Sequence, residues 1–349
     1  MAISNPVLQP NTMINIAEYY NRFTPDGNIA LIAEALSESN EIMSDIIWKE
    51  GTLQNGDQQT IRTGLPEVYW KQYNRGVPPS HSTTAVVQET LGMLEAQTKL
   101  DANLVEQNGK GLQFRYTEEA PFIESMGQTF TRTLFKGDAK VKSEGFSGFE
   151  TRYSTLDTAK AENAKNVIDC GGKGNNLTSI WLIGWGDNVY CPYPKGSKAG
   201  LQSRNLDDVL VQDDNGNSYR AYVSIYNLTA GLMVRDWRYV VRLANIDPTE
   251  LRNGTGIGNA TEGATNLIDK MLEALTLLPV QNVGKTKLAF YMNRDVQFGL
   301  TTLSRRQNSN VITWQQADNA FGKGGAWSTF QGVPLRRVDQ LTNTEKQVK

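Results

Sequence analysis

The chain has 349 residues, of which 39% are hydrophobic and 21% charged, with a formal net charge of −2. These values are typical of a globular protein with two or three domains, or of one body with large excursions, and they exclude a domain-wide basic field for nucleic-acid binding. Two cysteines, Cys170 and Cys191, are too few for a disulfide framework and indicate thiols in a reducing compartment. No stretch is apolar enough for a membrane span, and the N-terminus lacks the features of a signal peptide.

The N-terminal part of the chain is predicted to be an arm followed by a long β-excursion. Prolines interrupt residues 1–26, and the apolar residues of 29–46 recur at helical spacing. In the excursion, residues 48–79, the Asn55-Gly56-Asp57 sequence predicts a hairpin turn between strands at 51–54 and 58–64.

Four aromatic residues in this excursion need a hydrophobic partner, because a thin polar hairpin cannot bury them alone: Trp48, Tyr69, Trp70 and Tyr73. Burial against another subunit would satisfy them, since aromatic residues are enriched at protein interfaces. Packing back onto the core of the same chain would satisfy them equally well. Their spacing does not separate these two interpretations.

The middle of the chain is predicted to begin with an ambiguous segment and then to become helical. The apolar residues of 83–100 fit either a buried strand or a helix. Residues 101–136 are predicted to form two helical pieces, the second capped by Thr117, with Pro121 in its first turn and Gly137 at its end.

The second half is predicted to be rich in strands, with helices near the end. In the strand DWRYVVRLANI, alternation predicts a solvated charged face that includes Arg238 and Arg242. A capping pair, Asn259 and Glu262, predicts the start of an amphipathic helix. The remaining predicted elements are strands at 146–245, a helix at 259–278, a strand at KTKLAFYMN, a helix at 294–306 and a closing strand at VPLRRVDQL.

The sequence offers no catalytic, cofactor-binding or metal-binding constellation. The stretch 258–265, GNATEGAT, has the glycine spacing of a phosphate loop, but Ala264 stands where that motif has lysine, so a helix cap is the favoured interpretation. The single histidine, His81, lies in a Pro/Ser/Thr loop without partners for a triad or a zinc site. Asp213-Asp214 precede a turn and lack the spacing of a calcium loop.

The order of these elements resembles the major capsid (coat) protein of tailed bacteriophages, which has the Hong Kong 97 type fold. Residues 65–96, LPEVYWKQYNRGVPPSHSTTAVVQETLGMLEA, are similar to the end of that family's extended loop. EEAPFIESM and TLFKGD resemble its spine helix, and FSGFETRYSTLD resembles the entry to its axial domain. KLAFYMNRDVQFGLTTL and FQGVPLRRVDQL resemble the axial strand and helix and the closing strand. The ordered set, covering nearly the whole chain, carries the resemblance.

The resemblance implies an α+β architecture in four parts. An N-terminal arm would occupy residues 1–47, and an extended β-hairpin loop would occupy 48–79 and lie over a neighbouring subunit. The peripheral domain with the spine helix would comprise 80–145 and 331–349, and the axial domain 146–330. The expected inter-subunit contact residues are Trp48, Tyr69, Trp70, Lys71, Tyr73 and Arg75.

The resemblance also implies a function. Copies of the chain would self-assemble into an icosahedral shell of pentamers and hexamers that encloses double-stranded DNA without sequence-specific binding. The shell would be a virion capsid assembled in the cytoplasm of a host bacterium. The expected partners are a separate scaffolding protein, because the short N-terminal region leaves no room for a fused one, a portal and a decoration protein. No cofactor and no membrane are expected.

A covalent cross-link is not predicted. Lys71 lies in the loop that carries a cross-linking lysine in some family members, but the matching asparagine and glutamate cannot be placed by motif. Two alternative functions stay open. An encapsulin-like cellular nanocompartment would have the same fold and would enclose an enzyme. An α/β enzyme or ligand-binding protein would need a catalytic set that one loop histidine does not supply.

Overall fold

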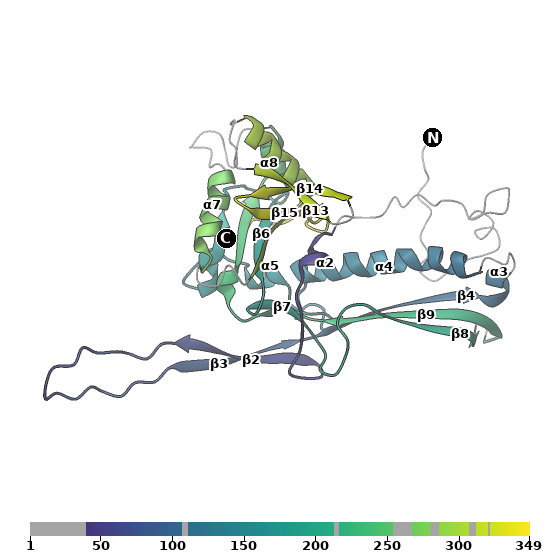
Figure 1. Ribbon diagram of the computed structural model, residues 1–349, viewed down its shortest axis with the longest axis horizontal. Coiled ribbons are helices and arrows are strands. Elements are labelled where there is room, and N and C mark those ends of the chain that lie inside the picture. Colours follow the sequence, from purple (N-terminus) through teal and green to yellow (C-terminus); the bar gives the residue numbers. More distant parts are fainter. Residues whose placement is uncertain are drawn as a thin grey trace. The chain divides into compact units, whose positions relative to one another are not determined.

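The computed structural model describes residues 40–106, 111–212, 216–253, 267–279, 286–306, 312–319 and 322–349 (Figure 1). These residues form two compact units. Unit 1 contains Leu94–Gly127 and Leu201–Leu228, and unit 2 contains Glu38–Met93, Gln128–Gly200 and Thr229–Lys349. Both units combine helices with sheets, as expected for an α+β chain.

Unit 1 contains a three-stranded sheet with the strand order β4-β9-β8. Strands β8 and β9 are antiparallel neighbours. A small apolar core, formed by Leu100, Val105 and Phe114, joins strand and helix residues. The elements that contribute to unit 1 are β4 (Gly92–Asp101), α3 (Ala102–Glu106), α4 (Gly111–Lys136), β8 (Gln202–Gln212) and β9 (Ser218–Ala230).

Arg115 ties helix α4 to this sheet through a hydrogen-bonded ion-pair network. Its Nε donates to Oε1 of Glu119 at 2.9 Å, and its Nη1 donates to Oδ1 of Asp207 at 2.7 Å. Its Nη2 donates to the hydroxyl of Ser224 at 2.8 Å. Arg115 and Glu119 are both buried, so these bonds are what make burial of their charges tolerable.

Unit 2 is built on a seven-stranded sheet with the order β13-β14-β15-β12-β6-β11-β5. Strand β6 pairs antiparallel with β11 and with β12, and β12 pairs parallel with β15. The strands of this sheet are β5 (Val167–Asp169), β6 (Thr178–Trp185), β11 (Val240–Ile246), β12 (Lys287–Met292), β13 (Ile312–Asn319), β14 (Gly322–Phe330) and β15 (Val333–Arg337).

Two smaller sheets and several short helices complete unit 2. One small sheet has the order β1-β7-β10, and the other is the β2–β3 pair. Their strands are β1 (Trp48–Glu50), β7 (Val189–Tyr193), β10 (Met233–Val234), β2 (Gly56–Gly64) and β3 (Thr83–Thr90). The helices are α2 (Ile42–Asp45), α5 (Phe149–Arg152), η1 (Glu162–Asn166), η2 (Trp237–Tyr239), α6 (Pro248–Asn253), α7 (Leu267–Leu277) and α8 (Arg294–Arg306).

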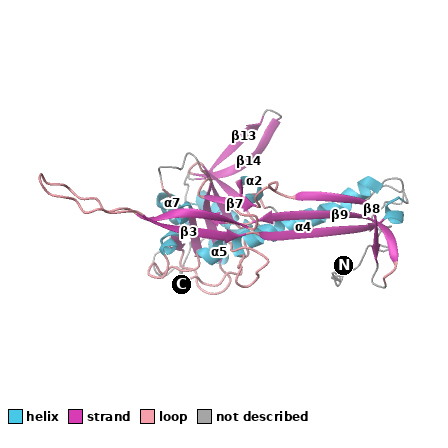
Figure 2. Cartoon of the chain, turned by 90° about the horizontal axis from the view of Figure 1, so that it is seen from below, coloured by secondary structure: helices cyan, strands magenta, loops and turns pink. Residues whose placement is uncertain are grey.

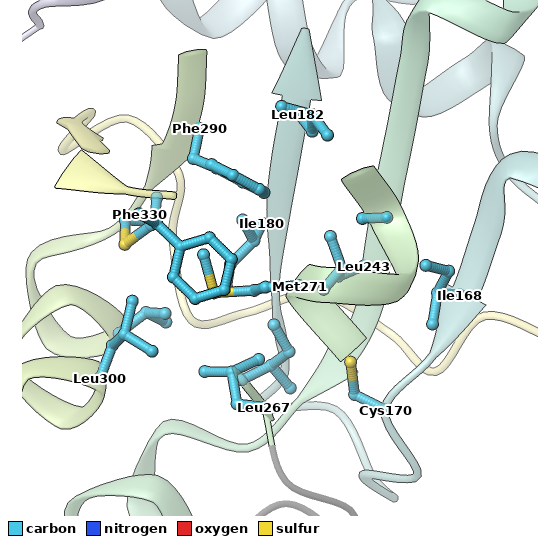
Figure 3. Close-up of a cluster of buried hydrophobic side chains, with 14 of the residues drawn as sticks. Ile168, Cys170, Ile180, Leu182, Leu243, Leu267, Met271, Phe290, Leu300 and Phe330 are labelled. Atoms are coloured by element: carbon cyan, nitrogen blue, oxygen red, sulfur yellow. The ribbon is translucent and has the colours of Figure 1, made fainter. Parts of the chain in front are cut away.

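Strand β6 is buried along its whole length because its sequence, TSIWLIGW, is apolar on both faces. On one face, Ile180 and Leu182 join the main core, where Leu267 and Met271 of α7 and Leu300 of α8 also lie (Figure 3). Each such fully buried side chain stabilises the fold by about 1.5–3 kcal/mol.

The opposite face of β6 carries an aromatic cluster. The ring of Trp181 lies 6.0 Å from Phe135, at the end of α4, and 5.8 Å from Phe149 of α5. Phe149 also meets Trp185 edge to face at 6.0 Å. The end of α4 and helix α5 are therefore held on the sheet by interlocking rings.

Most of the strongly apolar elements were predicted correctly. The structure confirms the strands within SIWLIGWGDNVYCPYP, DDVLVQDDNGNSYRAYVSIYNL and KTKLAFYMN, the closing strand, and the helix at 294–306. It also confirms two helical pieces in 101–136, with Gly137 following the last helical residue. The ambiguous segment 83–100 forms strands β3 and β4.

Two local predictions were wrong. Helix α4 begins at Gly111, so Thr117 and Pro121 lie in its interior, and Thr117 donates to the carbonyl of Gln113 instead of capping. The packing of Phe114 favours this earlier start. The Asn55-Gly56 turn does not join two paired strands, because residues 51–54 form no strand and β2 pairs with β3.

The predicted charged face of DWRYVVRLANI was also wrong. Residues 237–239 form the 3-10 helix η2, whose first turn Asp236 caps by accepting from the backbone N–H of Arg238 at 3.0 Å. Arg242 is 1% exposed, because a full set of internal partners satisfies its guanidinium. The glycine-rich stretch 258–265 with its Asn259–Glu262 cap, the Asp213-Asp214 pair, and the arm before residue 40 lie outside the described residues.

Candidate assembly surface

A β-hairpin with a long connecting loop dominates the exposed apolar surface of unit 2. Strands β2 and β3 pair antiparallel from Gly56↔Thr90 to Gly64↔Thr83. Between Gly64 and Thr83 the chain continues beyond the strands as a loop, drawn in pink in Figure 2. We call residues 65–82 the hairpin loop.

The hairpin loop exposes aromatic and aliphatic side chains that none of the described residues covers. The side chains of Trp70 and Tyr73 are fully exposed, at 103% and 100% of their reference areas. Leu65 and Val68 are almost as exposed, and Tyr69 is half exposed. Apolar side chains gathered in this way on one segment are typical of surfaces that another molecule covers.

The predicted contact residues separate into two groups. Tyr69, Trp70, Lys71, Tyr73 and Arg75 all lie on the exposed hairpin loop. Trp48 does not lie there, because it belongs to β1, which pairs with β7. Its ring stacks on Phe130 with 5.8 Å between centroids, so Trp48 packs on the core of its own chain.

The base of the hairpin is anchored by Asp57, whose carboxylate is fully buried. Oδ2 accepts from the hydroxyl of Tyr190 at 2.6 Å. Oδ1 accepts from the backbone N–H and the hydroxyl of Thr52 at 3.2 and 3.1 Å, and from Nε2 of Gln59 at 3.1 Å. Burial alone would raise the pKa of Asp57, but these donors outweigh it and hold the pKa below its usual value. The hairpin is thus tied to β7 by an ionised carboxylate.

A second anchor lies directly across the hairpin. Glu89 is the cross-strand partner of Asp57, so the two side chains lie on the same face. Nη1 of Arg152, on α5, donates to Oε1 of Glu89 at 2.6 Å. Nη2 of Arg152 donates to the carbonyls of Ser147 and Leu232. Two facing carboxylates would repel each other, but each has its own donors, and together they fix the hairpin at two points.

Sequence reasoning missed these anchors. Asp57 was assigned to a turn, and Glu89 lay in a segment whose structure the sequence left open. Their partners Tyr190 and Arg152 lie far away in the chain, so no local spacing links them. The one local sign of the Asp57 anchor is that this charged residue directly follows Gly56 at the start of β2.

No chemistry of catalysis gathers in the described parts of the chain. His81 lies exposed on the hairpin loop. Burial raises the pKa of the Cys170 thiol to about 12 and raises that of Cys191 as well, so neither is a ready nucleophile. Within the described ranges, no group of three or more acidic, cysteine or histidine side chains could hold a metal ion, and no helix could cross a membrane.

Comparison with known proteins adds the family. The model of the family Major capsid protein GP7 matches residues 24–349. A structure of bacteriophage Epsilon15 is similar with 30% identity and a TM-score of 0.70, covering 98% of this chain and 99% of that one. The capsid of bacteriophage JBD30 matches with 9% identity and a TM-score of 0.47, covering 88% and 93%. No curated protein matches the chain.

These matches decide among the three functions that the sequence left open. The family is that of a structural capsid protein, and no finding favours an encapsulin-like shell or an enzyme. The Hong Kong 97-like fold expected from the sequence is confirmed by the likeness to the solved structure of bacteriophage Epsilon15. With the family model matching almost all of its length, the chain belongs to the Major capsid protein GP7 family and is a major capsid protein of a bacteriophage virion.

Proposed function

We propose that copies of this chain join through the hairpin loop, which lies on a neighbouring subunit of the capsid. The observation that carries this proposal is the complete exposure of Trp70 and Tyr73 on a loop whose base is anchored at two points. A rigid base orients the loop before it meets a partner, which lowers the entropy lost on association. Aromatic anchors of this kind commonly carry most of the energy of an interface.

The charged residues of the same loop fit this role. Lys71 lies between Trp70 and Tyr73, Arg75 follows Tyr73 by two residues, and both basic residues are exposed. Charges at the rim of an interface mainly guide partner choice and association rate, whereas the aromatic residues supply affinity. Trp48 is left out of this contact set, because it stacks on Phe130.

At the scale of the particle, the proposal is an icosahedral shell of pentamers and hexamers around double-stranded DNA, assembled in the host bacterial cytoplasm. The net charge of −2 suits a container that must release DNA, since phosphate contacts dominate affinity for DNA. A separate scaffolding protein, a portal and a decoration protein are the proposed partners. Solved relatives in phage capsids support the shell, and the partners rest on the resemblance alone.

The four-part division of the chain also remains a proposal: arm, extended loop, peripheral domain and axial domain. The hairpin at 56–90 supports the extended loop, and the long helix α4 supports a spine helix. Residues 201–228 share unit 1 with 94–127, although they fall within the stretch 146–330 expected to be axial. The hairpin β8–β9 is therefore better counted with the peripheral part.

Substitution of Trp70 tests the proposed contact. Trp70→Ala should leave the isolated subunit folded, because the side chain is fully exposed among the described residues. It should reduce the yield of shells in electron microscopy and size-exclusion chromatography, since truncating an aromatic anchor typically costs about 2 kcal/mol or more per contact. Trp70→Phe is the matched control and should retain most of the assembly. Normal shell yield from Trp70→Ala would contradict the proposed contact.

A further inference from the structure

A polar cleft in unit 2 plays no part in the proposed assembly contact. It has a volume of about 670 Å³ and lies between the end of α4, helix α5, strand β11 and the C-terminal segment. Most of its lining side chains are polar or charged. Its size falls within the range of roughly 300–1,000 Å³ that is usual for sites that bind small molecules.

Arg242 lines the cleft and is held by a hydrogen-bond network in which the carboxylate of Glu345 balances its positive charge. Its Nη2 donates to Oε2 of Glu345 at 2.8 Å, and its Nε donates to the hydroxyl of Ser179 at 3.1 Å. Its Nη1 donates to the carbonyl of Tyr153 at 2.8 Å. Arg242 and Glu345 are both buried, and each cancels most of the field of the other. This ion pair therefore forms one side of the cleft and adds little net charge to it. The other charged groups of the lining determine which ligand the cleft favours.

Those other charges are mainly positive. Four lysines line the cleft: Lys136, Lys160, Lys346 and Lys349. Lys136 donates to the hydroxyl of Thr342 at 2.5 Å, and Lys160 pairs with the exposed Asp157 at 3.4 Å. Lys346 and Lys349 form no ion pair within the part of the chain that the structure describes.

One further carboxyl group, that of Glu150, faces the same space. Its Oε1 lies 3.6 Å from Nη2 of Arg242. Burial and the nearby Glu345 raise the pKa of Glu150, and they outweigh the opposing effect of Arg242 and Lys136. Glu150 therefore takes up a proton more readily than a free glutamate, so it can lower its repulsion toward an incoming anion.

We propose that this cleft binds a phosphate group. Five basic side chains line the cleft against two acidic ones, and Asp157 beside Lys160 adds a third carboxylate, so an excess of positive charge remains in a chain whose total charge is negative. The hydroxyls of Ser154 and Thr344 add neutral donors at the same surface. Phosphate oxygens accept several hydrogen bonds at once and favour lysine ammonium groups as partners. The group comes either from a small free phosphate compound or from the backbone of DNA, which share this chemistry.

Binding of inorganic pyrophosphate to the full-length subunit tests the site. Titration calorimetry should show binding that weakens at least tenfold in Lys136→Gln/Lys346→Gln. The matched control is Lys140→Gln/Lys142→Gln, which removes the same charge from exposed lysines outside the cleft and should change the affinity less than twofold. Lys136→Arg/Lys346→Arg keeps the charge and should retain binding. Equal weakening in both glutamine variants, or no binding to the unmodified subunit, would overturn the proposal.

A short DNA duplex distinguishes the two sources. Competition with bound pyrophosphate, together with the same tenfold loss in Lys136→Gln/Lys346→Gln, supports backbone phosphate as the natural ligand. Pyrophosphate binding that the duplex does not displace supports a small free phosphate compound. Thermal unfolding of each variant shows whether lost binding reflects lost charge. A glutamine variant that binds poorly only because it unfolds is replaced by Lys346→Gln alone, whose side chain is exposed, and unchanged binding there would also overturn the proposal.

Discussion

Asp57 carries a buried negative charge that the donors of Tyr190, Thr52 and Gln59 hold in place. Because its pKa is lower in the folded state than in the unfolded chain, it stabilises the fold above the ordinary carboxyl pKa of about 3.9. That contribution is lost as the pH falls through the lowered folded-state value. Asp57→Asn should therefore destabilise unit 2 at neutral pH by about 1–3 kcal/mol.

The pH dependence separates this charge effect from a simple packing defect. Urea unfolding of the protein and of Asp57→Asn should differ most at pH 6–7. The difference should shrink as the pH falls below about 3.9, the ordinary carboxyl pKa, and should close once the pH is below the lowered folded-state pKa of Asp57. Tyr190→Phe removes one donor only and should give a smaller loss. A difference that stays constant across the whole pH range would show that Asp57 acts through its shape and not through its charge.

The pKa of Glu150 is shifted in the opposite direction to that of Asp57. Its pKa is higher in the folded state, so the ionised carboxylate is unfavourable at neutral pH. The stability that this raised pKa contributes to the fold is fully present below about pH 4.3, the pKa of an ordinary glutamate. It is lost as the pH rises through the raised folded-state pKa of Glu150. Glu150→Gln should raise the melting temperature at pH 7 and leave it unchanged at pH 3.5. The exposed Glu162 is the control, because Glu162→Gln should change neither; a lower melting temperature for Glu150→Gln would contradict the sign.

At the scale of the element, the hairpin depends on a glycine beside its anchors. A Cβ atom added at Gly56 would lie 2.6 Å from the carbonyl oxygen of Glu89, so the strands would have to separate there. Gly56→Ala should cost about 1–3 kcal/mol and speed amide exchange and proteolysis across 56–90. Gly76, on the hairpin loop, has open space around it, so Gly76→Ala should be close to neutral. Equal protection of residues 56–90 from amide exchange and proteolysis in both variants would show that the β2–β3 pairing tolerates separation of the strands at Gly56.

The elements that were predicted correctly are those whose pattern of apolar residues fits only one kind of secondary structure. β6 is a continuous apolar run, and α8 has a clear amphipathic period, so their burial follows from local sequence. The wrong predictions came from local signals that distant partners override. Asn55-Gly56 is a good turn sequence, but the partner of β2 lies beyond the 18 residues of the hairpin loop, and only the folded chain shows this.

The candidate surface was predictable only in part, for the same reason. Its aromatic residues stood out because a polar loop cannot bury them, and in the structure Trp70 and Tyr73 are fully exposed while Tyr69 is half exposed. Trp48 looked the same in sequence, but parallel pairing of β1 with β7 brings it onto Phe130. The buried Arg242 likewise looked like a solvated charge, because its acceptors come from distant segments.

At the scale of the whole molecule, the subunit fold and the assembly contact are separable. Gly64 and Thr83 are cross-strand partners, so a two-residue Asn-Gly turn can join them in place of residues 65–82. The shortened chain should fold at least as stably as the full chain, because closing a shorter loop reduces the entropy cost by about 2 kcal/mol. If the hairpin loop lies on a neighbouring subunit, the same chain should fail to form shells.

A second replacement shows which property of the loop matters. An 18-residue Gly/Ser loop between Gly64 and Thr83 keeps the reach of the hairpin loop but removes its aromatic side chains. It should fold and fail to assemble, as the Asn-Gly chain does, because affinity comes from the buried aromatic residues and not from chain length. Shells of normal size from both chains, seen by electron microscopy of soluble material with native circular dichroism, would mean that other surfaces hold the capsid together. Assembly of the Gly/Ser chain alone would mean that backbone pairing along the loop is sufficient.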